Sequence, residues 1–552
     1  MEKAICLLLS GLAAASTAQS TRDIFVNASE IMGTLKNLQG VNSADTSYST
    51  PGNWTQDTFY NKDPSIGALF PDYAIEHVLI YTFPDVFLGW GKSGVDGDPM
   101  VNANYNWTGA DDYMQFVTDN GAKATIQFNP TNGTSSNVSS PERLAQIGYM
   151  ITDRYMNGAH DSGFENAIEL FEFLPEADLT RSRFSNVTYE NYFAYFAAFS
   201  RAVAEASDEA GVAAWGGNQI YPVDTNYSVS DPYVRRFYTD CHDQNVPIKA
   251  ASFHFTNTQF SFDPYDIIRV VDKFRAEVLV PASLPDLEIW ATEYELAPFP
   301  ILPTSRSALA SFNDSAFFAS YTLGVVSHPI LANSMFAQDT SIDQVLPWPG
   351  FGYNGTGAGG QPFPGFFNRS SSGPVPLNAA KAWKLQGKLV TETRNRLNVT
   401  GSSEDGFAAL AGVSSDASKV QVLLNNYQFD FDIATEITAQ LAPILNTSAS
   451  AYPLLQDNGL LNGEATCFIT GACMTFHQAA IRNNTSNAYR LSLVGLHWLE
   501  SDSYELQIHR VANGVTNSTY FQKTGQGNII DLTVPFPANA QDLVTVSKLS
   551  SQ

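Results

Sequence analysis

Short apolar runs alternate with helical patterns between about residues 37 and 390 of this 552-residue chain. The clearest helical pattern lies between residues 188 and 210, where aromatic side chains recur at steps of three and four and form one stripe. Such alternation is typical of a parallel β/α architecture. The apolar runs that predict strands are residues 38–42, 77–83, 122–129, 169–174, 212–217, 249–255, 287–292 and 329–336.

Eight strands joined by helical crossovers predict an α/β protein with a (β/α)8 barrel. An open doubly wound sheet is the alternative. No glycine fingerprint or P-loop follows the first predicted strand to favour it.

The pattern changes near residue 396. Four later runs of β type, separated by Asn, Gly and Ser turns, predict a C-terminal β-sandwich. Residues 345–375, rich in Pro, Gly and aromatics, are expected to form a long loop over the barrel mouth after the eighth strand. The predicted organisation is a signal peptide at 1–18, a catalytic barrel at 19–395 and a β-sandwich accessory domain at 396–552.

The first 18 residues predict secretion, because Lys3 precedes a short apolar stretch that ends in small residues. That stretch is too short to span a bilayer, so no membrane insertion is expected. Asn-x-Ser/Thr triplets recur along the chain and predict N-linked glycans on a secreted, extracellular glycoprotein. Thirteen of them begin at Asn27, Asn53, Asn106, Asn132, Asn137, Asn186, Asn226, Asn313, Asn354, Asn368, Asn398, Asn446 and Asn517.

The charge and the cysteines of the chain indicate which partners, cross-links and metal sites are expected. Lys and Arg number 30 against 55 Asp and Glu, a net charge of −25 that argues against a nucleic-acid partner. Cys467 and Cys473 are expected to form a disulfide that closes a short loop. Cys241 is expected to be a buried free thiol. The spacing of Cys and His predicts no metal site, and no cofactor is expected.

Two predicted strands end in carboxylates, at the end of a barrel where catalytic groups gather. In the fourth strand, period-two alternation places Glu172, Leu174 and Glu176 on one face, with Glu172 inside the barrel and Glu176 at the rim. In the seventh, Ile289, Ala291 and Glu293 are expected to share a face.

A facing pair of carboxylates suits the cleavage of glycosidic bonds. At about 5–5.5 Å one carboxylate attacks the sugar and configuration is retained, whereas at about 6.5–9.5 Å a water fits between them and configuration inverts. The sequence is compatible with either distance. It is also compatible with the alternative that both carboxylates are solvated acids on the surface.

The sequence resembles the retaining glycoside hydrolases of clan A, and within them family 39, the β-xylosidases and α-L-iduronidases. The resemblance implies hydrolysis of O-glycosidic bonds in an oligosaccharide or polysaccharide by double displacement, with Glu176 as general acid/base and Glu293 as nucleophile. Its segments are YNWTGADDYMQFVTDNGAKATIQFNP (105–130), FEFLPEADLT (171–180), YENYFAYFAAFSRAV (189–203), DQNVPIKAASFHFT (243–256), IWATEYE (289–295) and PLNAAKAWKLQGKL (376–389).

One residue departs from that family. Pro175 stands where an Asn normally precedes the acid/base and binds the sugar, and proline has no donor to replace it. This departure motivates a second hypothesis, a carbohydrate-binding cell-wall glycoprotein on the same fold with weak or no turnover. Glu295 is the alternative nucleophile.

Five further residues are predicted to bind substrate or orient the nucleophile. His254 is expected to hydrogen-bond the sugar or to orient Glu293. The alternative is a histidine inside the barrel whose hydrogen bonds are purely structural. Gln127 and Asn129 end the third strand and could line the pocket or belong to a loop. Tyr221 is expected to orient the nucleophile, and Trp348 to stack on a sugar ring.

Overall fold

The computed structural model describes residues 20–42, 63–82, 97–128, 140–174, 188–214, 220–221, 228–229, 232–256, 271–295, 342–347, 351, 355–356, 362–363, 366–403, 405–428, 484–512 and 519–549. For several of these residues, including His254 and Glu293, it describes the backbone only.

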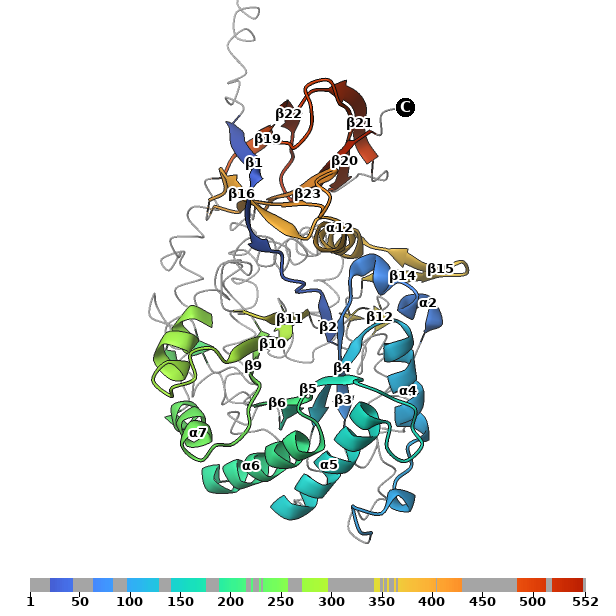
Figure 1. Ribbon diagram of the computed structural model, residues 1–552, viewed down its shortest axis with the longest axis vertical. Coiled ribbons are helices and arrows are strands. Elements are labelled where there is room, and N and C mark those ends of the chain that lie inside the picture. The colour runs from blue at the N-terminus through green and yellow to red at the C-terminus, as the bar shows by residue number, and fades with distance from the viewer. Residues whose placement is uncertain are drawn as a thin grey trace, which may run out of the picture.

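Eight parallel strands form the predicted barrel (Figure 1). The first and last of them lie side by side, since a Cβ added at Gly40 would come within 2.1 Å of Leu346 Cδ2. In barrel order the strands are β2 (Gly40–Asn42), β3 (His77–Thr82), β4 (Lys123–Phe128), β5 (Ile168–Phe173), β6 (Gly211–Ala214), β9 (Ala250–Thr256), β10 (Glu288–Glu295) and β11 (Gln344–Pro347).

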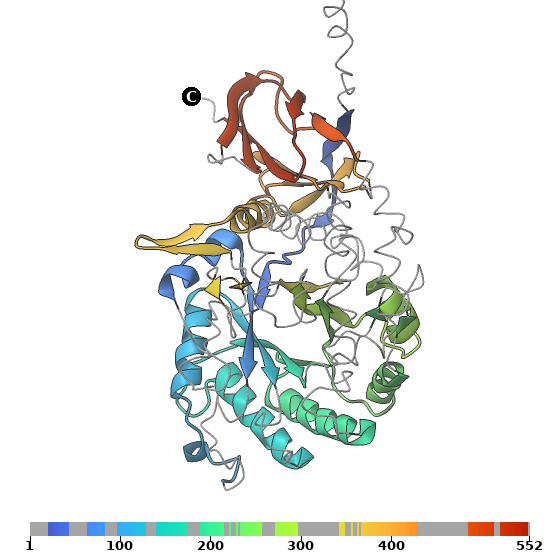
Figure 2. The ribbon, with the colours of Figure 1, turned by 180° about the vertical axis from the view of Figure 1, so that it is seen from behind.

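The eighth strand differs from the prediction. Residues 329–336 lie outside the described part of the chain, and the strand that pairs with β10 is β11, which falls inside the predicted loop 345–375. Within that loop region the structure also has two short hairpins, and one of them projects from the body of the molecule (Figure 2). Their strands are β12 (Gly355–Thr356), β13 (Pro362–Phe363), β14 (Phe367–Ser370) and β15 (Gly373–Pro376).

Helices cover the outer face of the barrel, and their ends carry ordinary capping signals. Thr188 Oγ1 accepts from the backbone N–H of Asn191 at the start of α6, and Ser140 does the same for Arg143 at the start of α5. The aromatic stripe of α6 is buried against the strands, as predicted. The helices are α2 (Pro64–Gly67), α4 (Thr108–Asp119), α5 (Pro141–Asn157), α6 (Tyr189–Ala206), α7 (Pro232–Asp243) and α12 (Asn378–Glu392), with short turns at Pro71–Tyr73, Asn102–Asn104 and Arg275–Leu279. None of these helices is long and apolar enough to cross a bilayer.

Among the residues that the structure describes, nine strands form a second sheet in the C-terminal domain. Side chains from β20 and β22, far apart in the strand order, share one apolar core, so the sheet folds over on itself as in a sandwich. The order is β21 (Thr519–Gln526), β20 (Ser503–Val511), β23 (Ala540–Lys548), β18 (Lys419–Asn426), β17 (Phe407–Val413), β16 (Asn395–Thr400), β1 (Ser20–Thr34), β19 (Ser486–Val494) and β22 (Ile530–Pro535).

The N-terminal strand β1 changes the expected domain boundary at residue 19. It lies between β16, to which it is antiparallel, and β19, to which it is parallel. Its alternate residues Ile24, Val26 and Ala28 are buried in the core of this second sheet. The C-terminal domain therefore contains a strand from the beginning of the chain, which the prediction had assigned to the barrel.

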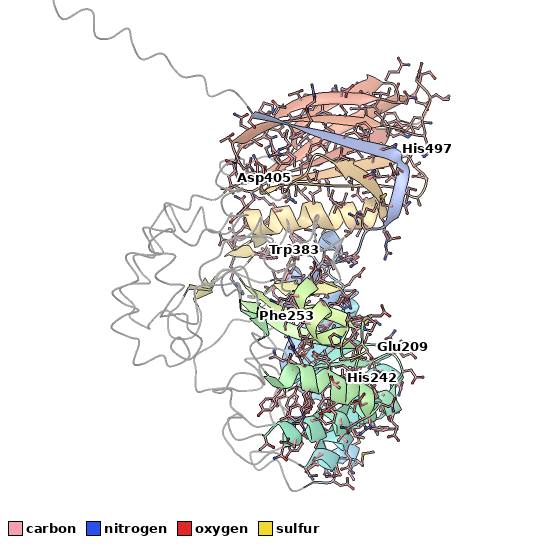
Figure 3. The ribbon with its side chains drawn as sticks, turned by 90° about the vertical axis from the view of Figure 1, so that its left-hand side faces the viewer. Glu209, His242, Phe253, Trp383, Asp405 and His497 are labelled. Carbon is pink, nitrogen blue, oxygen red and sulfur yellow. The ribbon has the colours of Figure 1, made fainter. Side chains whose placement is uncertain are left out.

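Helix α12 lies between the two domains, with Trp383 buried on it (Figure 3). The barrel's apolar core continues past this helix to side chains of the second sheet, namely Leu410, Leu423, Val511 and Leu543. One part of the second sheet thus packs into the barrel's core, while the sheet also has an apolar core of its own.

Candidate active site

The inside of the barrel is built in layers. Six apolar side chains from six different strands contact one another, which only the barrel interior allows. They are Leu79, Leu170, Ala213, Ala250, Trp290 and Leu346.

A polar layer follows, two residues further along several of the same strands and nearer their carboxyl ends. It contains Glu172 after Leu170, Ser252 after Ala250 and Thr292 after Trp290, and all three are buried. Gln127 of β4 joins them through its contact with Glu172. The carboxyl end of a parallel barrel is where active sites lie.

Glu172 is the centre of this layer, with none of its surface exposed. Gln127 Nε2 donates to its Oε2 at 3.1 Å, and Thr292 Oγ1 donates to its Oε1 at 2.5 Å. The prediction that Glu172 points into the barrel is confirmed. Because a buried acceptor left unpaired costs about 1–3 kcal/mol, these two bonds help to stabilise a carboxyl group at this place.

The strand that carries Glu293 is irregular at its end. Ala291 pairs with Phe253, but the next paired residue is Glu293, opposite His254, so Thr292 is one residue extra. The register with β11 shows the same shift. This is a β-bulge, a feature that re-aims side chains beside active sites.

Because of the bulge, the prediction that Ile289, Ala291 and Glu293 share one face of β10 is wrong. Ile289 and Ala291 belong to the outer core, between strands and helices, whereas Trp290 contacts the interior layer. Regular alternation would put residue 293 in phase with Ile289 and Ala291. The extra residue instead brings the backbone of Glu293 into register with His254, which has the inward phase of Ala250 and Ser252.

The strand that leads to Glu176 also departs from regular geometry. Strand β5 ends at Phe173, and Leu174 adopts a left-handed conformation with a φ of 50°. Its backbone N–H donates to Phe128 O, and its side chain packs in the outer core. The prediction that Leu174 shares a face with Glu172 and Glu176 is therefore wrong. Left-handed non-glycine residues are uncommon and concentrate at functional sites.

The other predicted site residues are placed only in part. Gln127 is buried in the polar layer, and His254 lies in β9 beside Glu293. Tyr221 ends β7 (Ile220–Tyr221) and pairs with Ser228 of β8 (Ser228–Val229). The predictions for Glu176, Asn129, Trp348, Cys467 and Cys473 lie outside the described residues.

Thr292 was not predicted to belong to the site. The Thr-Glu pair that it forms with Glu293 is part of the family resemblance, but the role of the threonine appears only when β5 and β10 face each other across the barrel. Cys241 is a buried free thiol, as predicted. Within the described ranges, no group of three potential metal ligands comes together.

Known structures share this architecture. A glucosidase from Croceicoccus marinus superposes with a TM-score of 0.71 at 18% identity, covering 96% of this chain and 100% of that one. The GH39 enzyme from Xanthomonas axonopodis pv. citri gives a TM-score of 0.62 at 13% identity, covering 98% and 100%. A bacterial orthologue of human α-L-iduronidase gives 0.59 at 12% identity, covering 97% and 85%.

At the level of sequence, no family model and no curated protein matches this chain. The structural likeness extends over both domains, so it concerns the pairing of barrel and sheet domain as well as the barrel itself. This chain has the fold of these glycoside hydrolases.

Proposed function

We propose that this protein is a retaining glycosidase with Glu176 as general acid/base and Glu293 as nucleophile. The observation that carries the proposal is the bulge at Thr292, which brings the backbone of Glu293 into the inward phase at the carboxyl end of the barrel. The left-handed Leu174, two residues before Glu176, adds support from the opposite strand. The names of the structural neighbours, a glucosidase and a GH39 enzyme among them, point to the same chemistry.

The reaction has two displacements. A carboxylate oxygen of Glu293 attacks the anomeric carbon while the glycosidic C–O bond breaks and Glu176 gives its proton to the departing oxygen. A water molecule then gives a proton to Glu176 and its oxygen attacks the anomeric carbon, which releases Glu293 and a sugar of retained configuration.

Substitution of the two glutamates tests the assignment. Glu176→Gln and Glu293→Gln should each lower the turnover of aryl glycosides by about 10²–10⁴-fold, because each removes a group that acts in the transition state. Glu500→Gln, at an exposed site on the second domain, is the control and should turn over substrate like the wild type. A covalent glycosyl adduct mapped by mass spectrometry identifies the nucleophile as Glu293 or Glu295.

Full activity in either glutamine variant would remove that residue from its role. Binding of glycans on an array, without hydrolysis of any bound glycan by the wild type, would instead support the carbohydrate-binding alternative that Pro175 motivates.

We also propose that the protein is secreted and carries N-linked glycans. The apolar stretch after Lys3 and the number of Asn-x-Ser/Thr triplets support this. Two of those triplets, at Asn106 and Asn368, begin at exposed residues.

A further inference from the structure

Glu172 connects three strands across the inside of the barrel. It lies on β5, its Oε2 accepts from Gln127 on the neighbouring strand β4, and its Oε1 accepts from Thr292 on β10. Strands β5 and β10 are not neighbours, since β6 and β9 lie between them. The bond from Thr292 therefore crosses the barrel, between the two strands assigned to acid/base and nucleophile.

Thr292 is the extra residue of the bulge, so it has no opposite residue in the register with β9. An extra residue of this kind is not held by the regular ladder, and its position depends on other contacts. The Thr292 hydroxyl is 2.5 Å from Glu172 Oε1 and 3.4 Å from Phe253 O. One hydroxyl proton serves the shorter contact, so the carboxyl group is its main acceptor.

We propose that Glu172 and Thr292 are positioning residues for the nucleophile: their bond holds the extra residue of the bulge inside the barrel and so keeps position 293 in register with His254. The catalytic consequence rests on the proposed function, whereas the effect on the backbone does not.

The reason is geometric. Without the bond, a buried carboxyl oxygen loses a close donor, and the bulge loses a contact that reaches across the barrel and favours its conformation. A slip of one residue reverses the face on which every following side chain lies. Even a displacement of about 1 Å at a reacting group can cost about 100-fold in rate.

The chain offers a matched set of variants. Thr292→Val keeps the shape and removes the donor, and Thr292→Ser keeps the donor. Thr125→Val is the control, because Thr125 is equally buried on β4 but its hydroxyl has no hydrogen-bond partner among the described residues. Crystal structures of all three and of the wild type measure the register of residues 291–294 directly.

The expected result is a shift of about 1 Å or more at position 293 in Thr292→Val, with Thr292→Ser and Thr125→Val superposing on the wild type. On an aryl glycoside, kcat of Thr292→Val should fall about 100-fold with little change in KM, because the loss concerns the transition state. Thr292→Ser should restore kcat.

Two outcomes overturn the inference: an unchanged backbone at 291–294 in Thr292→Val, or a kcat for that variant equal to that of Thr125→Val. If the wild type hydrolyses no glycoside, the proposed function is wrong, but the crystal structures still test whether the Thr292 bond holds the bulge.

A double variant gives a second test. If Glu172→Gln folds, its effect on kcat combined with that of Thr292→Val should be less than additive, since both substitutions act on one bond. Additive losses would count against the proposal.

Discussion

His77 lies inside the amino-terminal end of the barrel, at the opposite end from Glu172. Its ring meets the ring of Trp290 edge-on, with centroids 5.1 Å apart. Burial lowers the pKa of His77; the nearby Glu169 and Glu76 oppose that shift, and Lys123 and Lys249 add to it. The neutral imidazole is therefore the form that the folded barrel prefers.

This preference makes stability depend on pH in one direction. The unfolded chain binds the proton near pH 6.5, whereas folded His77 resists it until a lower pH, so its contribution is complete above pH 6.5 and declines as the pH falls toward the folded pKa. The free energy of unfolding, measured with urea between pH 7.5 and 5, should fall less in His77→Phe than in the wild type. The same slope in both proteins would show that His77 does not titrate in this way.

At the scale of elements, the regular parts of the fold could be predicted, because their signals are local. The stripe and the caps of α6 are examples, as are the apolar runs of β3, β4 and β5. The strand β11 was predicted as part of a loop, since it ends in Pro347 within a segment rich in proline and glycine. The place of β1 was missed because its partners are hundreds of residues away.

The same distinction applies to the candidate site. Period-two alternation placed Glu172 inside the barrel, and a buried carboxyl group is found there. It failed at Leu174 and at residue 293, where a left-handed residue and a bulge interrupt the pleat. Such interruptions depend on contacts between strands that are far apart in the sequence, so the pattern within one short segment does not predict them.

The position of β1 can be tested on two neighbouring residues. Val26 is fully buried and Phe25 is 45% exposed on the other face of the strand. Val26→Asp should lower the free energy of unfolding by about 3–5 kcal/mol, since it buries an unpaired charge. Phe25→Asp introduces the same side chain at a cost of about 1 kcal/mol or less. Urea denaturation measures both, and equal losses would contradict a central place for β1.

At the scale of the whole molecule, the shared core predicts that barrel and sheet domain support each other. The apolar cluster of the barrel includes Leu410 and Leu543 from the second sheet, and α12 lies between the two domains (Figure 3). Close approach adds to this, because a Cβ at Gly412 would come within 1.9 Å of Thr393 O, just after α12. The second domain is thus a structural part of the barrel's support.

Folding should also decide which Asn-x-Ser/Thr triplets carry glycans. Asn484 starts such a triplet but is only 6% exposed, and its side chain bonds Asn426 Oδ1 and the N–H of Ser486. Protein from a glycosylating secretory host should carry glycans at the exposed Asn106 and Asn368 and none at Asn484. Peptide mapping by mass spectrometry, with Asn106→Gln and Asn368→Gln as controls, measures occupancy. A folded protein with a glycan on Asn484 would contradict the buried environment described for it.

Strand β1 is synthesised long before its two neighbours in the second sheet, β16 and β19. About 450 residues separate the end of β1 from the start of β19, and ribosomes add roughly 5–20 residues per second, so the strand waits roughly 20–90 s for its last partner. All eight barrel strands are translated in that interval. A strand with an apolar face and no partners is prone to wrong pairing, so we expect β1 to be exposed to that risk until synthesis is nearly complete.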